Sequence, residues 1–466
     1  MSKSEGPAAD FAGVARGVRW SALSAFVLRL SQFSMGVITA RIVAPEQFGT
    51  YAVALTVFTI VITISDAGVA QAVVRDVMRT AQIGPSAMTI TFSATLLTAV
   101  AMAAGASPLA TVLGASAADG PIRILALTLV ASSFGTIPAM VLARDYRQRE
   151  RFYSDAANFV VSSALLILLA LDGWGAMALA CSRLAGQIVS AVVLNSLVGE
   201  RYGFGFDRQE VASLLRFSAP LALANCLLVA VSNVDTIAVA RIAGATQLGF
   251  YNLAFTVAAW PVSIFSSILM NITVTTLARV QHDVTALRAH LAAAMSSLAG
   301  AAFPVSALLM ALAGPVIVDV YGTRWSPAAP ILVTLGLFAS VRVVQVLLTD
   351  LLIATGHTPV LLRLQFIWLI ALIPMMIVCT MRWGIIGAGI AHVVVGVFLI
   401  LPLYLSAVRQ RTGIGLGWLF ASTGRPALGA VAAGLTAWFV GSSTEGSWVQ
   451  LLAGGLAGLT VYIGVT

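Results

Sequence analysis

The chain has 466 residues, of which 59% are hydrophobic and only 9% are charged, and its mean hydropathy is +0.97. Soluble globular domains carry about 25% charged residues, so this composition excludes that class and predicts an integral membrane protein. The net charge is +8. For a membrane protein of this composition we nevertheless expect no nucleic-acid partner. Because the three cysteines lie inside apolar segments, we predict buried thiols and no disulfide or metal site.

Apolar segments alternate with short polar stretches along the whole chain. Segments of about 18 to 25 residues let α-helices cross a hydrocarbon core of roughly 30 Å, whereas a membrane β-barrel would give shorter, alternating segments. The polar N-terminal stretch lacks the compact apolar core of a cleaved signal peptide. We predict an all-α, polytopic membrane protein of about fourteen transmembrane helices, near residues 18–40, 51–73, 87–108, 122–142, 156–172, 175–198, 216–240, 251–275, 288–312, 328–352, 360–380, 384–407, 426–441 and 448–465.

The basic residues indicate the orientation, because cytoplasmic loops of membrane proteins are enriched in Lys and Arg. With a cytoplasmic N-terminus, most basic residues lie at inner ends and loops. The densest inner cluster is the segment ARDYRQRERF at 143–152, which we interpret as a topology anchor that also contacts anionic lipid. We expect a multi-pass protein of the bacterial inner membrane with both termini in the cytoplasm. The basic residues left at outer ends are Arg41, Arg123, Arg241, Arg324 and Arg382.

Two stretches of the chain repeat each other. The segment ARIVAPEQFGTYAVALTV at 40–57 reappears two hundred residues later as ARIAGATQLGFYNLAFTV at 240–257. A second match, at an offset of 209, pairs GWGAMALACSR at 173–183 with RWGIIGAGIAH at 382–392. Since six predicted spans separate the copies, both have the same orientation, which is typical of a parallel repeat. We predict two parallel six-helix lobes around a central cavity plus two extra C-terminal helices, with boundaries at 1–205, 206–410 and 411–466.

The shared polar residues of the first repeat suggest a scaffold. We expect Gly49 and Gly249 to permit a tight turn into the next span, since glycine adopts turn conformations at no steric cost. Tyr51 and Tyr251 are expected in the aromatic belt at the membrane interface. The repeated segment then marks two equivalent lobes, which is what alternating access requires.

Longer stretches around these repeats resemble a known family. Residues 16–76, which include GTYAVALTVFTIVITISDAGVAQAVVRD, and 216–281, which include SNVDTIAVARIAGATQLGFYNLAF, are similar to the two lobes of polysaccharide flippases of the Wzx type. These belong to the superfamily that also contains the MurJ lipid II flippases and the MATE exporters. The resemblance implies a V-shaped pair of lobes that moves a polyprenyl-diphosphate-linked oligosaccharide from the inner to the outer leaflet by alternating access. Membrane lipids, the polysaccharide polymerase and the chain-length machinery are the further partners it implies.

Basic side chains inside predicted spans point to a cationic cavity. A charge at the centre of a membrane helix costs about 2.5 to 3.5 kcal/mol on insertion scales, so such residues face water or one another. Arg183 and His392 occupy equivalent positions of the second repeat, and each lies near mid-membrane. Together with Arg29 and Arg342 they give the positive bias expected for a diphosphate or acidic-sugar cargo. The alternative for His392 alone is a hydrogen-bonded interior histidine.

Polar and acidic residues complete the candidate site. Gln32 on the first span and Asn225 and Ser232 on the seventh lie on polar helix faces. These faces are interpreted either as the walls of the cavity or as polar packing between helices. Three acids in spans are candidates for coupling to an ion or for a gate, with structural pairing to nearby arginines as the alternative: Asp66, Asp235 and Asp350.

Other function classes are disfavoured. A membrane transferase or polymerase would ordinarily carry a sizeable outer loop with catalytic carboxylates or histidines, and the predicted outer loops are short. We therefore expect no enzyme and no cofactor. The sequence has no GxxxxGK phosphate loop, so we also expect no ATP-driven motor in this chain. A cation-coupled MATE-type exporter of small molecules has the same two-lobe fold and is the alternative, although its cavity is expected to be acidic.

Overall fold

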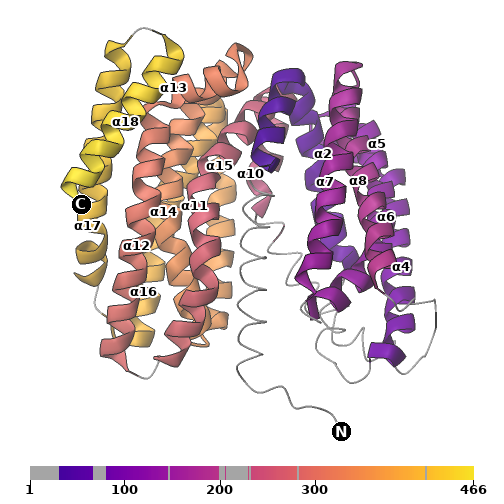
Figure 1. The fold of residues 1–466 in the computed structure, drawn as a ribbon, viewed down its shortest axis with the longest axis horizontal. Helices are drawn as coiled ribbons and strands as arrows, with labels where there is room; N and C mark the ends of the chain where they lie inside the picture. Colours follow the sequence, from indigo (N-terminus) through magenta and orange to yellow (C-terminus); the bar gives the residue numbers. More distant parts are fainter. Residues whose placement is uncertain are drawn as a thin grey trace. The chain divides into compact units, whose positions relative to one another are not determined.

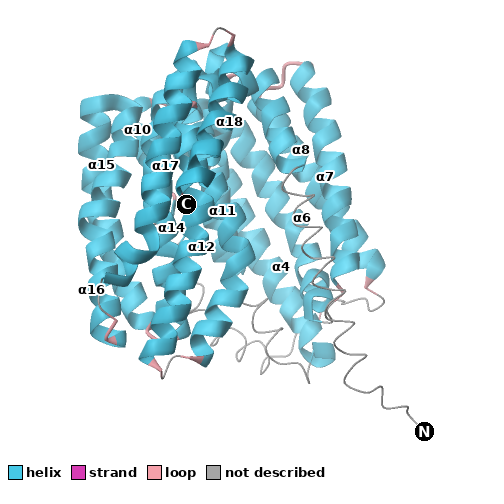
Figure 2. Ribbon diagram, turned by 60° about the vertical axis from the view of Figure 1, so that its left-hand side comes forward, coloured by secondary structure: helices cyan, strands magenta, loops and turns pink. Residues whose placement is uncertain are grey.

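The computed structural model describes residues 31–66, 80–144, 147–198, 205, 229, 232–280, 283–414, 417–444 and 446–466. Within these ranges every regular element is a helix and no β-strand occurs (Figure 2), which confirms the predicted all-α class. The chain divides into two compact units, 1–233 and 234–466, which we call unit 1 and unit 2.

Nine helical segments of the described ranges are long and apolar enough to cross a membrane. They become ten if Met88–Ala104 and Ala106–Val112, which meet at a 62° bend, form one span. The long segment Pro359–Thr412 covers the two spans expected near 360–380 and 384–407. The chain is therefore a multi-pass membrane protein. The count of fourteen stays a prediction, because most of the first and seventh expected spans lies outside the described residues.

Unit 1 is a bundle in which α8 packs against both α6 and α7 (Figure 1). Pro138 interrupts the hydrogen bonding of α6, because its ring nitrogen cannot donate to the Phe134 carbonyl. Asn195 on α8 donates to that carbonyl instead, at 2.8 Å, as the apolar surroundings of a membrane helix require. The helices of unit 1 are residues 31–42, α2 (Pro45–Asp66), α4 (Thr80–Ala104), α5 (Ala106–Val112), η2 (Ser116–Ala118), α6 (Asp119–Arg144), α7 (Gln148–Leu171) and α8 (Ala176–Leu197).

Unit 2 contains the second set of helices and the two C-terminal ones. The two last helices, α17 and α18, pack on each other and on α12 (Figure 1), and the Tyr462 hydroxyl donates to the Gly300 carbonyl at 2.7 Å. The helices of unit 2 are α10 (Val234–Ala243), α11 (Ala245–Arg279), α12 (Val284–Ala311), α13 (Ala313–Pro315), η3 (Val316–Tyr321), η4 (Thr323–Ala328), α14 (Ala329–Ala354), α15 (Thr358–Val394), η5 (Val395–Ile400), α16 (Leu401–Thr412), α17 (Gly417–Ser443) and α18 (Ser447–Val465).

The backbone of the second repeat is alike in both units. Gly175 adopts φ 52° and ψ −120°, and its counterpart Gly384 adopts φ 60° and ψ −146°. Only glycine populates this region readily, so both copies use glycine to break the chain at the same point. In unit 1 the break separates α7 from α8, and in unit 2 it kinks α15.

The prediction of a tight turn at Gly49 and Gly249 is wrong. Both glycines lie inside helices, Gly49 in α2 and Gly249 in α11. The chain turns about one helical turn earlier, at residues 43–44 in unit 1 and at Gly244 (φ 84°) in unit 2. Glycines in a membrane helix are compatible with close packing of neighbouring helices and need no turn.

Candidate functional site

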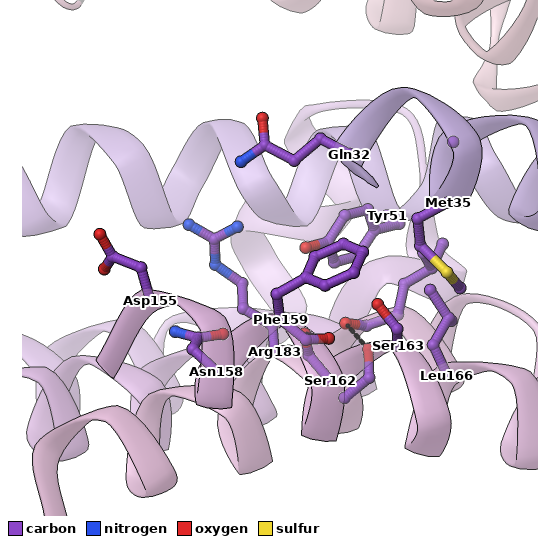
Figure 3. Close-up of a pocket in the computed structure, with 13 residues that line it drawn as sticks. Gln32, Met35, Tyr51, Asp155, Asn158, Phe159, Ser162, Ser163, Leu166 and Arg183 are labelled. Atoms are coloured by element: carbon purple, nitrogen blue, oxygen red, sulfur yellow. Dashed lines mark hydrogen bonds between the residues drawn. The ribbon is translucent and has the colours of Figure 1, made fainter. Parts of the chain in front are cut away.

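Unit 1 contains a pocket of about 500 Å³ formed by residues 31–42, α2, α7 and α8. In Figure 3 the side chain of Arg183 lies between Gln32 on one wall and the polar side chains of α7 on the other. The apolar part of the lining includes Met35, Phe159 and Leu166. The polar part consists of Gln32, Tyr51, Asp155, Asn158, Ser162, Ser163, Ser182 and Arg183.

The start of α8 places Arg183 in this pocket. The Gln47 side chain on α2 accepts a hydrogen bond from the backbone N–H of Ala176, at 2.9 Å, at the first residue of α8. A helix leaves its first N–H groups unsatisfied, and Gln47 supplies one acceptor from a neighbouring helix. Arg183 follows about two turns later on α8.

Aromatic rings hold the Arg183 side chain. Its guanidinium carbon lies 5.1 Å from the centroid of the Phe58 ring, in a cation–π contact, and the guanidinium also interacts with the Tyr51 side chain. Arg183 is exposed, and among the residues that the structure describes no carboxylate forms a salt bridge with it. The group is therefore a fixed cation with free donors, the arrangement that binds phosphate or carboxylate through two parallel hydrogen bonds.

We expect Gly175→Ala to lower the stability of unit 1 by about 1–3 kcal/mol, because an L-residue is strained at this backbone conformation. The added Cβ would also collide with the Gln47 side chain that anchors α8. Thermal unfolding of the purified protein in detergent measures the loss. Gly314→Ala is the matched control, since nothing lies within 4 Å of its added Cβ. Equal melting temperatures for the two variants would contradict this role of Gly175.

Unit 2 places a buried polar triad at the equivalent positions. The Tyr251 hydroxyl on α11 donates to Asp235 Oδ2 on α10 at 2.8 Å, and His392 Nε2 on α15 lies 3.1 Å from the same hydroxyl oxygen. His392 Nε2 also lies 3.5 Å from Asp235 Oδ2. Because the hydroxyl proton is given to the carboxylate, Nε2–H of His392 is the donor to Tyr251. The side chains form one network with exposed fractions of 6% for Asp235, 0% for Tyr251 and 5% for His392.

Aromatic rings enclose the imidazole of His392. The Phe338 ring stacks on it with centroids 4.7 Å apart, and the Phe255 ring lies at 6.3 Å. His392 Nδ1 is buried and has no hydrogen-bond partner among the described residues. Asp235 Oδ1 accepts a further hydrogen bond from the Thr236 backbone at 2.8 Å. The prediction that Tyr251 lies at the membrane interface is wrong, because its side chain is fully buried in unit 2 and its hydroxyl group bonds to Asp235 and His392.

The repeat relates the two sites residue by residue. Tyr51 and Arg183 of unit 1 correspond to Tyr251 and His392 of unit 2, and in each unit the tyrosine contacts the basic residue. The acid has no counterpart, because the residue two hundred positions before Asp235 is Met35. In unit 2 the basic group is paired and buried, whereas in unit 1 it faces a pocket. Two differences in sequence, Met35 against Asp235 and Arg183 against His392, therefore accompany the change from a buried polar network to an open cationic site.

The structure brings some of the predicted site residues together and leaves others apart or outside the described residues. Gln32 lines the pocket with Arg183, and Asp235 joins His392, so these pairs are brought together. Arg342 on α14 lies beside the unit 2 triad. Its guanidinium is 5.9 Å from the Trp368 ring centroid, Trp368 contacts the Phe338 ring that stacks on His392, and the guanidinium interacts electrostatically with Asp235. The remainder are Asp350, buried on α14; Ser232, exposed; Asp66, the last residue of α2, whose side chain lies outside the described part; and Arg29 and Asn225, which lie outside the described residues. That all of them line one central cavity stays a prediction.

The polar face of α7 was not predicted from the sequence. Asp155, Asn158 and Ser162 line the pocket, yet they were not among the predicted site residues. Their spacing of three and four residues is the signal that identifies one face of a helix inside an apolar span. The contact between Tyr51 and Arg183 was not predicted either, although the repeat shows that Tyr51 and Tyr251 occupy equivalent positions.

Comparisons with known proteins agree on one kind of protein. The sequence model of the family described as "Polysaccharide biosynthesis protein" matches residues 38–330. The succinoglycan biosynthesis transport protein ExoT of Rhizobium meliloti (strain 1021) is 28% identical over 98% of this chain and 93% of its own length. The lipopolysaccharide biosynthesis protein WzxC of Escherichia coli (strain K12) is 23% identical over 85% of this chain and 81% of its own.

Solved structures confirm the predicted fold. The lipid II flippase MurJ, in an inward closed conformation, matches with a TM-score of 0.76 at 14% identity, covering 95% of this chain and 97% of that chain. An inward-facing multidrug resistance MATE family transporter matches with a TM-score of 0.66 at 15% identity, covering 82% of this chain and 96% of that chain. At these identities the likeness concerns the fold.

Proposed function

This chain belongs to the polysaccharide biosynthesis protein family, and from that premise we propose that it is a flippase for a polyprenyl-diphosphate-linked oligosaccharide. It moves this lipid from the inner to the outer leaflet by alternating access, and the oligosaccharide then enters a cell-surface polysaccharide. Two relatives that match most of the chain are named as a transport protein for succinoglycan and a biosynthesis protein for lipopolysaccharide. The reaction changes no covalent bond, so the protein acts as a transporter and not as an enzyme.

The pocket around Arg183 is the observation that supports this cargo best. A diphosphate carries negative charge and several acceptor oxygens, which a guanidinium without a carboxylate partner can bind. A small-molecule exporter for cationic drugs would use the opposite sign. In unit 1 the repeat has methionine at the position of the unit 2 acid, which leaves Arg183 available.

The protein is proposed to reside in the bacterial inner membrane with both termini in the cytoplasm. The excess of arginine at the inner ends of the predicted spans supports this orientation. In this arrangement the N-terminal end of α7, with Arg149 and Arg151, lies at the cytoplasmic side, where the lipid-linked oligosaccharide is loaded. The polymerase and the chain-length machinery act on the product at the outer leaflet.

Deletion of the gene is expected to strand complete lipid-linked oligosaccharide on the cytoplasmic leaflet, because synthesis continues while translocation stops. Mass spectrometry of extracted lipids should detect full-length repeat units, and surface polymer should be lost until the wild-type gene is restored. Normal polymer together with increased drug sensitivity would instead identify an exporter of small molecules. Accumulation of incomplete units would place the protein in synthesis and would contradict the proposal.

A further inference from the structure

Helix α7 carries a polar face within an apolar span. Asp155, Asn158 and Ser162 follow one another at spacings of three and four residues and so lie on one side of the helix, where they line the pocket (Figure 3). Ser163 extends this face by one residue. From Asp155 to Ser162 the face is about 10 Å long, at 1.5 Å per residue.

In the described part of the chain these side chains form no hydrogen bond between helices, although Asn158 and Ser162 pack against Gly186 of α8. Within the described part of the chain neither the Asn158 amide nor the Ser163 hydroxyl has a hydrogen-bond partner, and Ser162 donates only to the Phe159 carbonyl of its own helix. The seam between α7 and α8 has its own polar contact, because Ser154 and Ser190 are buried there with hydroxyl oxygens 2.8 Å apart. Asn158 and Ser163 are half-buried and line the pocket, so their polar groups are available to a ligand that enters it.

The second copy of the repeat shows that the fold does not require a polar face here. At the offset of 209 that matches the two Trp–Gly pairs, the face of α7 corresponds to residues of α15. The counterparts are Leu364, Ile367, Ala371 and Leu372, all apolar. The corresponding helix face of unit 2 is therefore apolar. The polar residues of this face are specific to unit 1 and are not required by the fold.

The chemistry of the face matches the hydroxyl groups of sugars. A carboxylate accepts hydrogen bonds from neighbouring hydroxyls, an amide both donates and accepts, and serine hydroxyls do either. Arg183 lies in the same pocket, so a ligand with an anionic group and a row of hydroxyls would contact both. Arg151, one turn before Asp155, interacts electrostatically with its carboxylate and extends the face toward the basic end of α7.

We propose that the polar face of α7, comprising Asp155, Asn158, Ser162 and Ser163, binds the saccharide of the transported lipid and determines which oligosaccharides are accepted, while Arg183 binds the diphosphate. The inference rests on the proposed function and names the part of the cargo that each group recognises. Unit 1 then carries the recognition of the headgroup, and unit 2 has no comparable face on α15.

Two ligands separate the saccharide contribution from the phosphate contribution. The probes are the polyprenyl-diphosphate-linked oligosaccharide purified from the deletion strain and polyprenyl diphosphate without sugar, each titrated into the purified protein in lipid nanodiscs. Asn158→Leu should weaken binding of the glycosylated lipid about tenfold, the size expected for lost hydrogen bonds to the sugar, and change binding of the sugar-free lipid less than twofold. Ser162→Ala, a smaller change, should show the same selectivity with a smaller loss.

Controls decide between recognition and misfolding. Arg183→Ala should weaken both lipids, and Val160→Ala, on the exposed opposite side of α7, should weaken neither. Equal losses for both lipids in Asn158→Leu and Ser162→Ala, or no loss in either, would overturn the saccharide site while leaving the flippase intact. Failure of the wild-type protein to bind the glycosylated lipid would overturn the proposed function itself.

Discussion

Replacement of Arg183 by glutamate should abolish polysaccharide export at unchanged protein level. The guanidinium lies over the Phe58 ring and, among the described residues, forms no salt bridge with Asp155 or another carboxylate, so its removal breaks no ion pair. Hydrogen bonds to charged groups contribute about 1.5–3 kcal/mol each, and loss of a bidentate contact alone corresponds to at least a tenfold weaker binding. A carboxylate at this place adds repulsion of the diphosphate. Complementation of the deletion strain, scored as surface polymer, measures the effect.

The series at Arg183 distinguishes charge from geometry. Arg183→Ala should inactivate nearly as strongly as the glutamate variant, and Arg183→Lys should retain partial activity, because an ammonium keeps the charge and loses the planar fork. Arg123→Ala is the matched control, since Arg123 forms an exposed ion pair with Asp119 and lies outside the pocket. Full activity of Arg183→Ala at matched expression would refute a cationic headgroup site.

The repeat and the fold class could be predicted because both depend on patterns that are present in the sequence itself, namely the lengths of apolar segments and the similarity of two stretches of chain. Apolar length identifies spans, and the Trp–Gly pairs align Arg183 with His392. Arg183 and His392 differ in type and in their surroundings, and His392 pairs with Asp235, which is distant in sequence and corresponds to Met35 in unit 1. The pattern assigned both residues to one cavity, which stays a prediction, and the structure shows His392 buried in a hydrogen-bonded network within unit 2.

The rest of the site was hard to predict because the sequence does not show which face of a membrane-spanning helix lines a pocket. In a span that is apolar on all sides, a few small polar residues do not tell which side faces a pocket, so the α7 face was not recognised. The same ambiguity affected Tyr51 and Tyr251, since a tyrosine near a span end suits the interface as well as an interior hydrogen bond. Only the packing of α10, α11 and α15 shows that Tyr251 is an interior residue.

Tyr251→Phe should strongly destabilise unit 2. The change takes away the donor to Asp235 and the acceptor for His392, and it leaves both groups buried. Each unsatisfied buried group costs about 1–3 kcal/mol, and a loss of 1 kcal/mol lowers the melting temperature of a unit of this size by roughly 2–4 °C. Thermal unfolding in detergent measures the shift. Tyr321→Phe makes the same chemical change at a buried tyrosine outside the triad and should cost less.

A double-mutant cycle tests whether the triad acts as one unit. Asp235→Ala leaves the Tyr251 hydroxyl without its acceptor, and His392→Ala removes the imidazole that stacks on Phe338. Residues in one hydrogen-bond network show coupling energies of about 0.5–3 kcal/mol, so the double variant should lose less stability than the two single losses added together. Additive losses would mean that Asp235 and His392 stabilise unit 2 independently. The coupling expected here would instead explain why unit 2 keeps its basic residue buried, whereas unit 1, with Met35 in place of the acid, leaves Arg183 exposed in the pocket.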